Sequence, residues 1–173
     1  LRIEYFFVAA VMLLLFVGSI AATNFFFQKE MVAQQETYLR RKNTLLTDQL
    51  PPSVFEKGQL TNQQQLLVTH ALDDAEERVT LLQKNGTVFF DSSQNEPLES
   101  HKKRPEIAAV LSGATYGSAL RKSKTLNKEL LYVATPVLKS GEIVGIIRIS
   151  EQTALFSKNI QSFRRYIIFT FGI

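Results

Sequence analysis

The first part of the chain is a continuous apolar run, because no charged residue occurs between Tyr5 and Gln28. At about 1.5 Å of rise per residue, a helix over this run is long enough to cross a hydrocarbon core of roughly 30 Å. A helix that packs on the core of a soluble domain would have a polar face toward solvent, and this run has none. A cleaved signal peptide would need a small-residue cleavage site, for which Ser19–Thr23 is the nearest candidate. The pattern therefore favours an uncleaved transmembrane helix over residues 1–28.

A second apolar run covers Tyr166–Ile173. We expect it to be the start of a second transmembrane helix, so that residues 29–165 are held by both ends at one face of a membrane. The segment Glu151–Arg165 has a helical spacing of apolar residues and leads directly into this run. It is therefore predicted to be the output helix, which connects the domain to the second span.

Between the two apolar runs, residues 29–77 are predicted to form an extracytoplasmic helical segment. Met31, Tyr38 and Leu45 recur every seven residues, with polar and charged residues on the other faces. A narrow seam of this kind predicts that two chains associate along the helix.

Two further signals divide this segment. The Pro-Pro pair at 51–52 is expected to end the first helix. Thr61 with Gln64 resembles a capping box, so a second helix should begin there and end near Glu77.

From Arg78 onward the spacing of apolar residues changes to the alternation typical of strands. An Asn85-Gly86 turn between the first two runs predicts a hairpin, and Pro105 at a first helical turn predicts a short helix over Ile107–Leu111. Five strands in meander-like order, with this helix inserted after the second, predict an α+β fold with a PAS-like antiparallel sheet over residues 78–150. The predicted strands are Val79–Gln83, Thr87–Phe90, Gly117–Lys122, Leu130–Val137 and Ile143–Ile149.

The formal net charge is +4, and Arg2 and Glu4 cancel, so the positive balance belongs to the region between the apolar runs. Charges of both signs alternate there without a basic stripe, which argues against nucleic-acid binding. The chain has no cysteine, which excludes disulfides, thiolate catalysis and zinc-cysteine sites. Exported domains without disulfides are common where the exterior is not oxidising, so we expect a bacterium without a periplasm.

Three segments carry a family resemblance. They are RVTLLQKNGTVFFDSS from Arg78 to Ser93, RPEIAAVLSGATYGSALRKSKTLNKELLYVATPV from Arg104 to Val137, and GEIVGIIRIS from Gly141 to Ser150. Together they resemble the extracytoplasmic sensor domain of Gram-positive phosphate-regulon sensor histidine kinases of the PhoR type. More generally, they are similar to the PAS-like Cache sensor domains of membrane receptors.

This resemblance implies a homodimeric receptor in the cell membrane that responds to phosphate starvation or to the state of the cell envelope. It implies that ATP and Mg²⁺ bind in a cytoplasmic kinase part outside this chain, which would act on a response regulator, and that the residues present here include no catalytic group and no cofactor site. A chemoreceptor, a cyclase sensor or a wall-facing interaction module without an enzyme remains the alternative.

The candidate ligand-binding residues follow from the expected sheet, because a PAS-like sheet encloses ligands between its concave face and the segment that covers it. These candidates are Asp91, Arg104, Tyr116, Arg121, Lys122 and Tyr132. The alternative is that the tyrosines pack and the basic residues coat a solvent-exposed face.

The loop before His101 contains several residue types that can bind a metal ion. His101 lies near Asp91, Glu96 and Glu99, but this spacing matches no established ligand loop. We therefore expect no metal there, and we expect the loop to be solvated.

Overall fold

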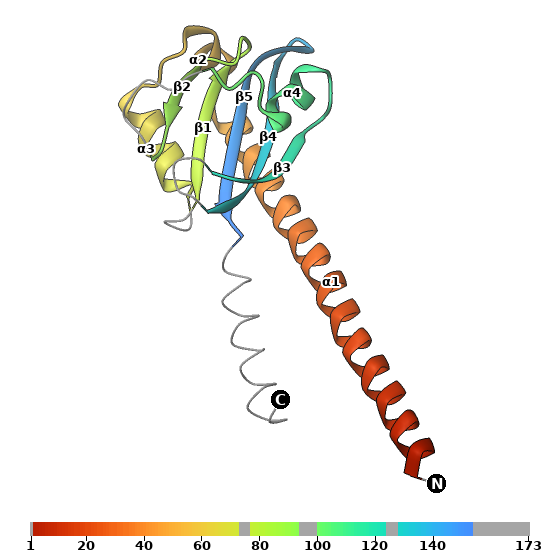
Figure 1. Cartoon of the computed structure of the whole chain (residues 1–173). Helices are drawn as coiled ribbons and strands as arrows, with labels where there is room; N and C mark the ends of the chain where they lie inside the picture. The colour runs from red at the N-terminus through yellow and green to blue at the C-terminus, as the bar shows by residue number, and fades with distance from the viewer. Residues whose placement is uncertain (1, 73–76, 94–99, 124–127, 154–173) are drawn as a thin grey trace. The chain divides into compact units, whose positions relative to one another are not determined.

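The computed structural model describes residues 2–72, 77–93, 100–123 and 128–153 (Figure 1). The chain divides into two compact units, Leu1–Gln35 and the part from Glu36 onward, and each is taken by itself. Helix α1 (Arg2–Gln49) begins in the first unit and ends in the second.

The first unit is helical and apolar. Most of its side chains are exposed, as at Phe6 and Leu14. Among the described residues, α1 is the helix that is long and apolar enough to cross a membrane, with a mean hydropathy of 2.5 over its most apolar window. This finding fits the membrane anchor predicted for residues 1–28. The second predicted span, Tyr166–Ile173, lies outside the described residues.

The second unit is built on a five-stranded antiparallel sheet, which confirms the predicted fold class. Its strands are β1 (Arg78–Gln83), β2 (Val88–Asp91), β3 (Gly117–Lys122), β4 (Glu129–Lys139) and β5 (Glu142–Gln152). Their order in the sheet is β2-β1-β5-β4-β3, so the predicted meander is wrong: the last strand lies in the centre, between β1 and β4. The reason is burial, because all residues from 145 to 150 are buried, as expected of a strand covered on both faces.

Helices cover one face of the sheet. Residues 36–49 of α1 and helix α2 (Pro52–Lys57) bury Leu39, Leu46 and Phe55, which share the core with sheet residues such as Leu81 and Ile147. The Asn43 side chain is fully buried, and its Nδ2 donates a hydrogen bond of 2.9 Å to the carbonyl of Val133 in β4. In Figure 1 this end of α1 passes behind the sheet.

The predicted seam of α1 does not face the sheet. Tyr38 is 41% exposed and Leu45 is 60% exposed, whereas the buried positions are their neighbours Leu39 and Leu46. The Tyr38 hydroxyl donates to Glu77 Oε1 at 3.3 Å within the same chain, and nothing in the structure tests association of two chains along the seam.

Helix α3 (Asn62–His70) has the predicted capping box. The Gln64 amide donates to Thr61 Oγ1 at 3.3 Å, and the Thr61 amide donates to Gln64 Oε1 at 2.9 Å. The predicted end near Glu77 is wrong, because the helix ends at His70 and Glu77 directly precedes β1. Lys42 Nζ pairs with the Glu77 carboxylate at 2.6 Å, which places Glu77 against α1.

The hairpin and the short helix are confirmed. Gly86 has a φ of 86° in the turn between β1 and β2, which only glycine adopts without strain. Helix α4 (Pro105–Leu111) has its proline in the first turn. Strand β5 continues to Gln152, so Glu151 is part of a strand and not the first residue of a helix. Gln152 is likewise in the strand and Thr153 is in a turn, and residues 154–165 of the predicted output helix lie outside the described residues.

Candidate functional site

The face of the sheet opposite α1 and α2 is covered in part by α4. Ile107 and Val110 of α4 pack with Leu82, Ala134 and Ile146 of the sheet in an apolar cluster. Side chains alternate along a strand, so Arg148 and Ser150 of β5 lie on the same face as Ile146. Beside the apolar cluster, this face therefore carries charge in the centre of the sheet.

Arg148 is the central member of this polar region and is only 2% exposed. Its Nη2 donates to Thr80 Oγ1 at 2.9 Å, and its Nη1 lies 3.4 Å from Glu106 Oε1. Burial is the main reason that the pKa of Arg148 falls to about 10, and the Glu106 carboxylate acts in the opposite direction. Arg148 thus remains a cation at neutral pH, held in a buried position.

Glu106 comes from the first turn of α4 and is fully buried. The same Oε1 that faces Arg148 also accepts a hydrogen bond of 3.0 Å from Arg121 Nη2 of β3. The backbone of Glu106 lies directly against Gly117, where a Cβ atom would collide with the Glu106 carbonyl oxygen. The glycine at 117 thus allows α4 to approach β3 closely enough for this contact.

Tyr132 of β4 lies beneath both arginines. The Arg121 guanidinium is 3.7 Å from the ring centroid, and the Arg148 guanidinium is 5.1 Å from it. Tyr132 is 4% exposed, and the contact of a cation with a desolvated aromatic face is favourable. Tyr132 therefore supports the two arginines from the sheet.

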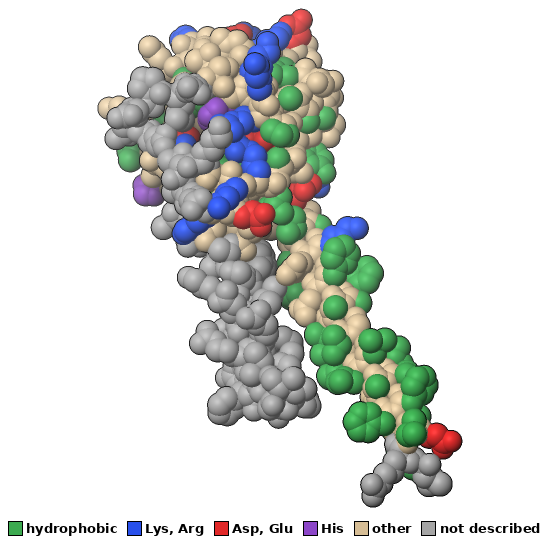
Figure 2. Space-filling model, in the orientation of Figure 1, with side chains coloured by type: hydrophobic (Ala, Val, Ile, Leu, Met, Phe, Trp, Pro, Cys, Tyr) green, Lys and Arg blue, Asp and Glu red, His purple; other side chains and the backbone are tan. Residues whose placement is uncertain are grey.

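A second carboxylate, Asp91 at the end of β2, completes the network. It pairs with Arg78 Nε at 2.8 Å and accepts from Thr80 Oγ1 at 2.9 Å. Thr80 Oγ1 also accepts a hydrogen bond from Arg148, so this hydroxyl connects the Arg78–Asp91 pair to the Arg148–Glu106 pair. We call Arg78, Thr80, Asp91, Glu106, Arg121, Tyr132 and Arg148 the buried polar cluster. Figure 2 shows basic and acidic side chains side by side in the middle of this face.

His101 lies next to the cluster and is 8% exposed. Its backbone amide donates to the Gly86 carbonyl at 2.9 Å, which attaches it to the β1–β2 turn. Burial, followed by the positive charges of Arg148, Arg104 and Arg78, lowers the pKa of His101 to about 4, and Asp91 alone opposes this shift. His101 is therefore neutral at pH 7. The expectation that the whole loop from Asp91 to His101 is solvated is wrong at both of its ends, because both residues are buried.

Several buried polar atoms of this region have no hydrogen-bond partner among the residues that the structure describes. They are Glu106 Oε2, Arg121 Nε, Arg148 Nε, Ser150 Oγ and His101 Nδ1. Buried polar atoms are normally paired, so this concentration of exceptions is a feature to explain.

The structure separates the six candidate residues. Asp91, Arg121 and Tyr132 belong to the buried polar cluster. Arg104 is the N-cap of α4 and lies close enough to His101 to influence it. Tyr116 instead stacks with Arg40 of α1, whose guanidinium is 4.9 Å from its ring centroid. Lys122 is exposed, and it follows Arg121 directly in β3, so the two side chains lie on opposite faces of the strand.

Sequence reasoning missed the central members of the cluster, Arg148, Glu106, Arg78 and Thr80. A signal for Arg148 was available, since a charged residue interrupts the otherwise apolar run of Ile143–Ile149. A charge in such a strand is buried and must be paired. No comparable signal marks Glu106, because an acidic residue in a first helical turn is common on solvent-exposed helices.

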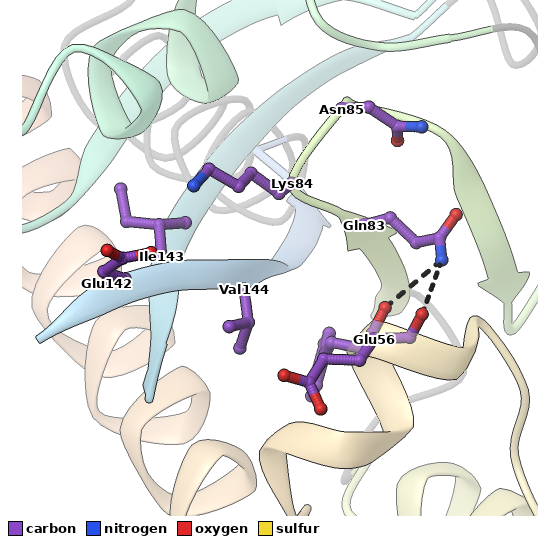
Figure 3. Close-up of a pocket in the computed structure, with 8 residues that line it drawn as sticks. Glu56, Gln83, Lys84, Asn85, Glu142, Ile143 and Val144 are labelled. Carbon is purple, nitrogen blue, oxygen red and sulfur yellow. Dashed lines mark hydrogen bonds between the residues drawn. The ribbon is translucent and has the colours of Figure 1, made fainter. Parts of the chain in front are cut away.

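An open pocket of about 380 Å³ lies elsewhere, between α2, the turn that joins β1 to β2 and the start of β5 (Figure 3). Gln83 lines this pocket, and its Nε2 donates hydrogen bonds to the carbonyls of Phe55 and Glu56, both at 3.3 Å. Its other lining residues are Lys84, Asn85, Glu142, Ile143 and Val144. Residues of the buried polar cluster are not among them. This pocket is open and lacks a buried ion pair, so we regard the cluster as the better candidate site.

Residues 48–152 match the single Cache-like domain family, and the chain therefore belongs to that family. Cache domains are extracellular sensors of membrane receptors, such as histidine kinases and chemoreceptors, and the apolar N-terminal helix fits a membrane anchor in such a receptor. The predicted Cache-type fold is thereby confirmed. No curated protein sequence matches the chain.

Solved structures with similar folds include three sensor or ligand-binding proteins. The sensor domain of the V. cholerae histidine kinase DctB is 19% identical, with a TM-score of 0.58 over 73% of this chain and 52% of that one. An extracellular ligand-binding receptor from Desulfohalobium retbaense is 10% identical, with a TM-score of 0.58 over 76% of this chain and 25% of that one. The ligand-binding domain of the Campylobacter jejuni chemoreceptor Tlp3, in complex with 4-methylisoleucine, is 13% identical, with a TM-score of 0.53 over 72% and 52%. This chain thus spans about half of the DctB and Tlp3 structures, and the likeness concerns the fold.

Proposed function

We propose that this chain is the extracytoplasmic sensing module of a membrane-bound sensor histidine kinase of the PhoR type, in the cell membrane of a Gram-positive bacterium. The stimulus would be phosphate starvation or a change in the cell envelope. The observation that supports this proposal most directly is the position of Arg148. It belongs to a buried, incompletely paired polar cluster, and it lies on β5, the central strand that leads toward the second apolar run.

The physical basis of sensing would be a change in how the cluster is paired. Arg148 on β5, Arg121 on β3 and Glu106 on α4 connect three elements through one carboxylate oxygen. A stimulus that binds one arrangement of these charges better than another shifts the population toward it. Because packed elements switch between discrete arrangements, a small shift of β5 can be passed to the segment that follows it.

The partners follow from the same proposal. Two chains would pair along the α1 seam, where Tyr38 and Leu45 are exposed. ATP and Mg²⁺ would bind in a kinase domain outside this chain, which would transfer phosphate to a response regulator. Nucleic acid is not an expected partner, since the sequence has no basic stripe.

The location of the domain can be tested by cysteine labelling, because the chain has no cysteine of its own. Ser118 of β3 is exposed, and Ser150 of β5 is 1% exposed. In intact cells a membrane-impermeant maleimide should label Ser118→Cys and should leave the buried control Ser150→Cys unlabelled until the protein is denatured. Labelling of Ser118→Cys only after the membrane is permeabilised would contradict the extracytoplasmic location.

The output class needs a separate test on the full-length protein in membranes. Addition of ATP and Mg²⁺ should produce acid-labile phosphohistidine. A chemoreceptor is the second candidate, supported by the similarity of the fold to the Tlp3 ligand-binding domain. Reversible methylation of glutamate side chains without phosphohistidine would favour it and would contradict the kinase.

A further inference from the structure

We propose that Arg121 and Arg148 form a binding site for a small oxyanion, a carboxylate or a phosphate, and that the Glu106 side chain occupies this site until such an anion displaces it. This inference rests on the proposed sensing function and specifies its ligand class. It is carried by the pairing of the cluster, by the unpartnered atoms around it and by the position of Glu106 on α4.

The pairing of Glu106 is one-sided. Its Oε1 faces both guanidinium groups, at 3.0 Å from Arg121 and 3.4 Å from Arg148, while its Oε2 is buried without a partner. A well-formed arginine–carboxylate pair uses both oxygens in two parallel hydrogen bonds. Glu106 therefore fills the position of an anion without satisfying either arginine fully.

The unsatisfied donors lie on the same side of the sheet. Arg121 Nε, Arg148 Nε and Ser150 Oγ are all buried and unpaired within the described part of the chain. Ser150 follows Arg148 by two residues in β5, so both side chains leave the same face of the strand. Three donors that lack an acceptor match a ligand with several acceptor oxygens, as carboxylates and phosphates have.

The charge of the cluster leads to the same ligand class. Asp91 is paired with Arg78 at 2.8 Å, so the cations of Arg121 and Arg148 share the single charge of Glu106. His101 contributes no positive charge at pH 7, because its pKa is lowered to about 4. Among the described residues, the cluster therefore has an excess of one positive charge, and the largely buried guanidinium of Arg148 requires a partner. A small anion would supply it.

The position of Glu106 explains how binding could be read out. Glu106 lies in the first turn of α4, while Ile107 and Val110 hold the helix in the apolar cluster. Displacement of the carboxylate would remove the ionic attachment of α4 to β3 and β5 without removing the helix from the sheet. The backbone of Glu106 contacts Gly117, so a movement of this turn would reach the start of β3 directly.

Binding can be measured on the full chain in an uncharged maltoside micelle, which avoids lipid phosphates. Inorganic phosphate and acetate are titrated separately at constant ionic strength, with chloride as the control anion, and heat is recorded by calorimetry. Glu106→Gln removes the competing charge and keeps the shape of the side chain. We expect this variant to bind phosphate, acetate or both at least tenfold more tightly than the wild type. The anion whose affinity increases shows whether the site takes a phosphate or a carboxylate.

Glu56→Gln is the matched control. Glu56 also pairs with a basic residue, Lys139 at 2.8 Å, but in an exposed position away from the cluster. It should bind phosphate and acetate as the wild type does. Adding Arg121→Gln to Glu106→Gln should weaken the binding at least tenfold, because one of the two arginines is then missing.

Two results would overturn the inference: no heat from either oxyanion with Glu106→Gln, or equal affinities in Glu106→Gln and the wild type. If Glu106→Gln does not fold, phosphate or acetate must raise its folded fraction and chloride must not, and a lack of rescue would count against the site. These outcomes are independent of the proposed function, which the labelling and phosphohistidine experiments test without any added anion.

Discussion

His101 should make the stability of the domain depend on pH in a range where few other groups titrate. Its imidazole is buried, and its pKa is lowered from 6.5 to about 4. In the unfolded chain the imidazole binds a proton below pH 6.5, whereas in the folded domain it stays neutral down to about pH 4. The unfolded state therefore binds more protons between these two values, and the folded state loses stability as the pH falls through this window.

The magnitude follows from the size of the shift. One pKa unit corresponds to about 1.36 kcal/mol, so the complete loss below pH 4 amounts to about 3 kcal/mol. Between pH 7 and pH 5 the linkage relation gives a loss of about 2 kcal/mol. Carboxylates ionise mainly below pH 5, so this interval isolates the histidine.

The measurement is urea unfolding of the full chain in micelles at pH 7 and pH 5. Unfolding can be followed by the near-ultraviolet circular dichroism of tyrosine, because the chain contains five tyrosines and no tryptophan. His101→Gln should lose much less stability than the wild type over this interval. His70→Gln, at an exposed position of α3, should retain the full dependence. Equal losses in the wild type and His101→Gln would refute the reasoning.

The same unfolding assay at pH 7 checks three further predictions. Phe55→Ala should cost about 3–5 kcal/mol, because Phe55 is fully buried between α2 and the sheet; a cost below 1 kcal/mol would contradict this packing. Asn43→Ala should cost about 1–3 kcal/mol, because it removes the hydrogen bond to the Val133 carbonyl; an unchanged midpoint would contradict that contact. Glu56→Gln should change stability by less than about 1 kcal/mol, since its pair with Lys139 is exposed.

Local pattern was sufficient for the elements of the fold. The alternation from Arg78 onward, the Asn85-Gly86 turn and the Thr61–Gln64 capping box are each read from a few neighbouring residues, and each corresponds to an observed feature. The order of the strands was not predictable in this way. It depends on the pairing of β5 with β1, which joins Arg78 to Ser150 and is not encoded in any short segment.

The candidate site was predictable only in part. Asp91, Arg121 and Tyr132 were identified by residue type, and the sheet brings them to one face. Glu106 and Arg148 lie 42 residues apart in sequence and meet only because α4 packs on the central strand. Their pairing is therefore a property of the tertiary structure.

Burial distinguishes these two residues from ordinary surface charges. Glu106 is fully buried and Arg148 is 2% exposed, which the sequence alone could not establish. Removing one partner of a buried pair leaves the other without compensation, so such pairs respond strongly to a change in either partner. This sensitivity makes the cluster suited to a sensor.

The most direct test of the account is the rate of phosphohistidine formation by the full-length protein in membranes. The wild type, Glu106→Gln and the exposed control Glu56→Gln are compared with ATP and Mg²⁺ under identical conditions. If the buried polar cluster sets the output of the receptor, Glu106→Gln should change the rate at least threefold in either direction, and Glu56→Gln should leave it unchanged. Identical rates in all three proteins, with Glu106→Gln shown to be folded, would contradict the account.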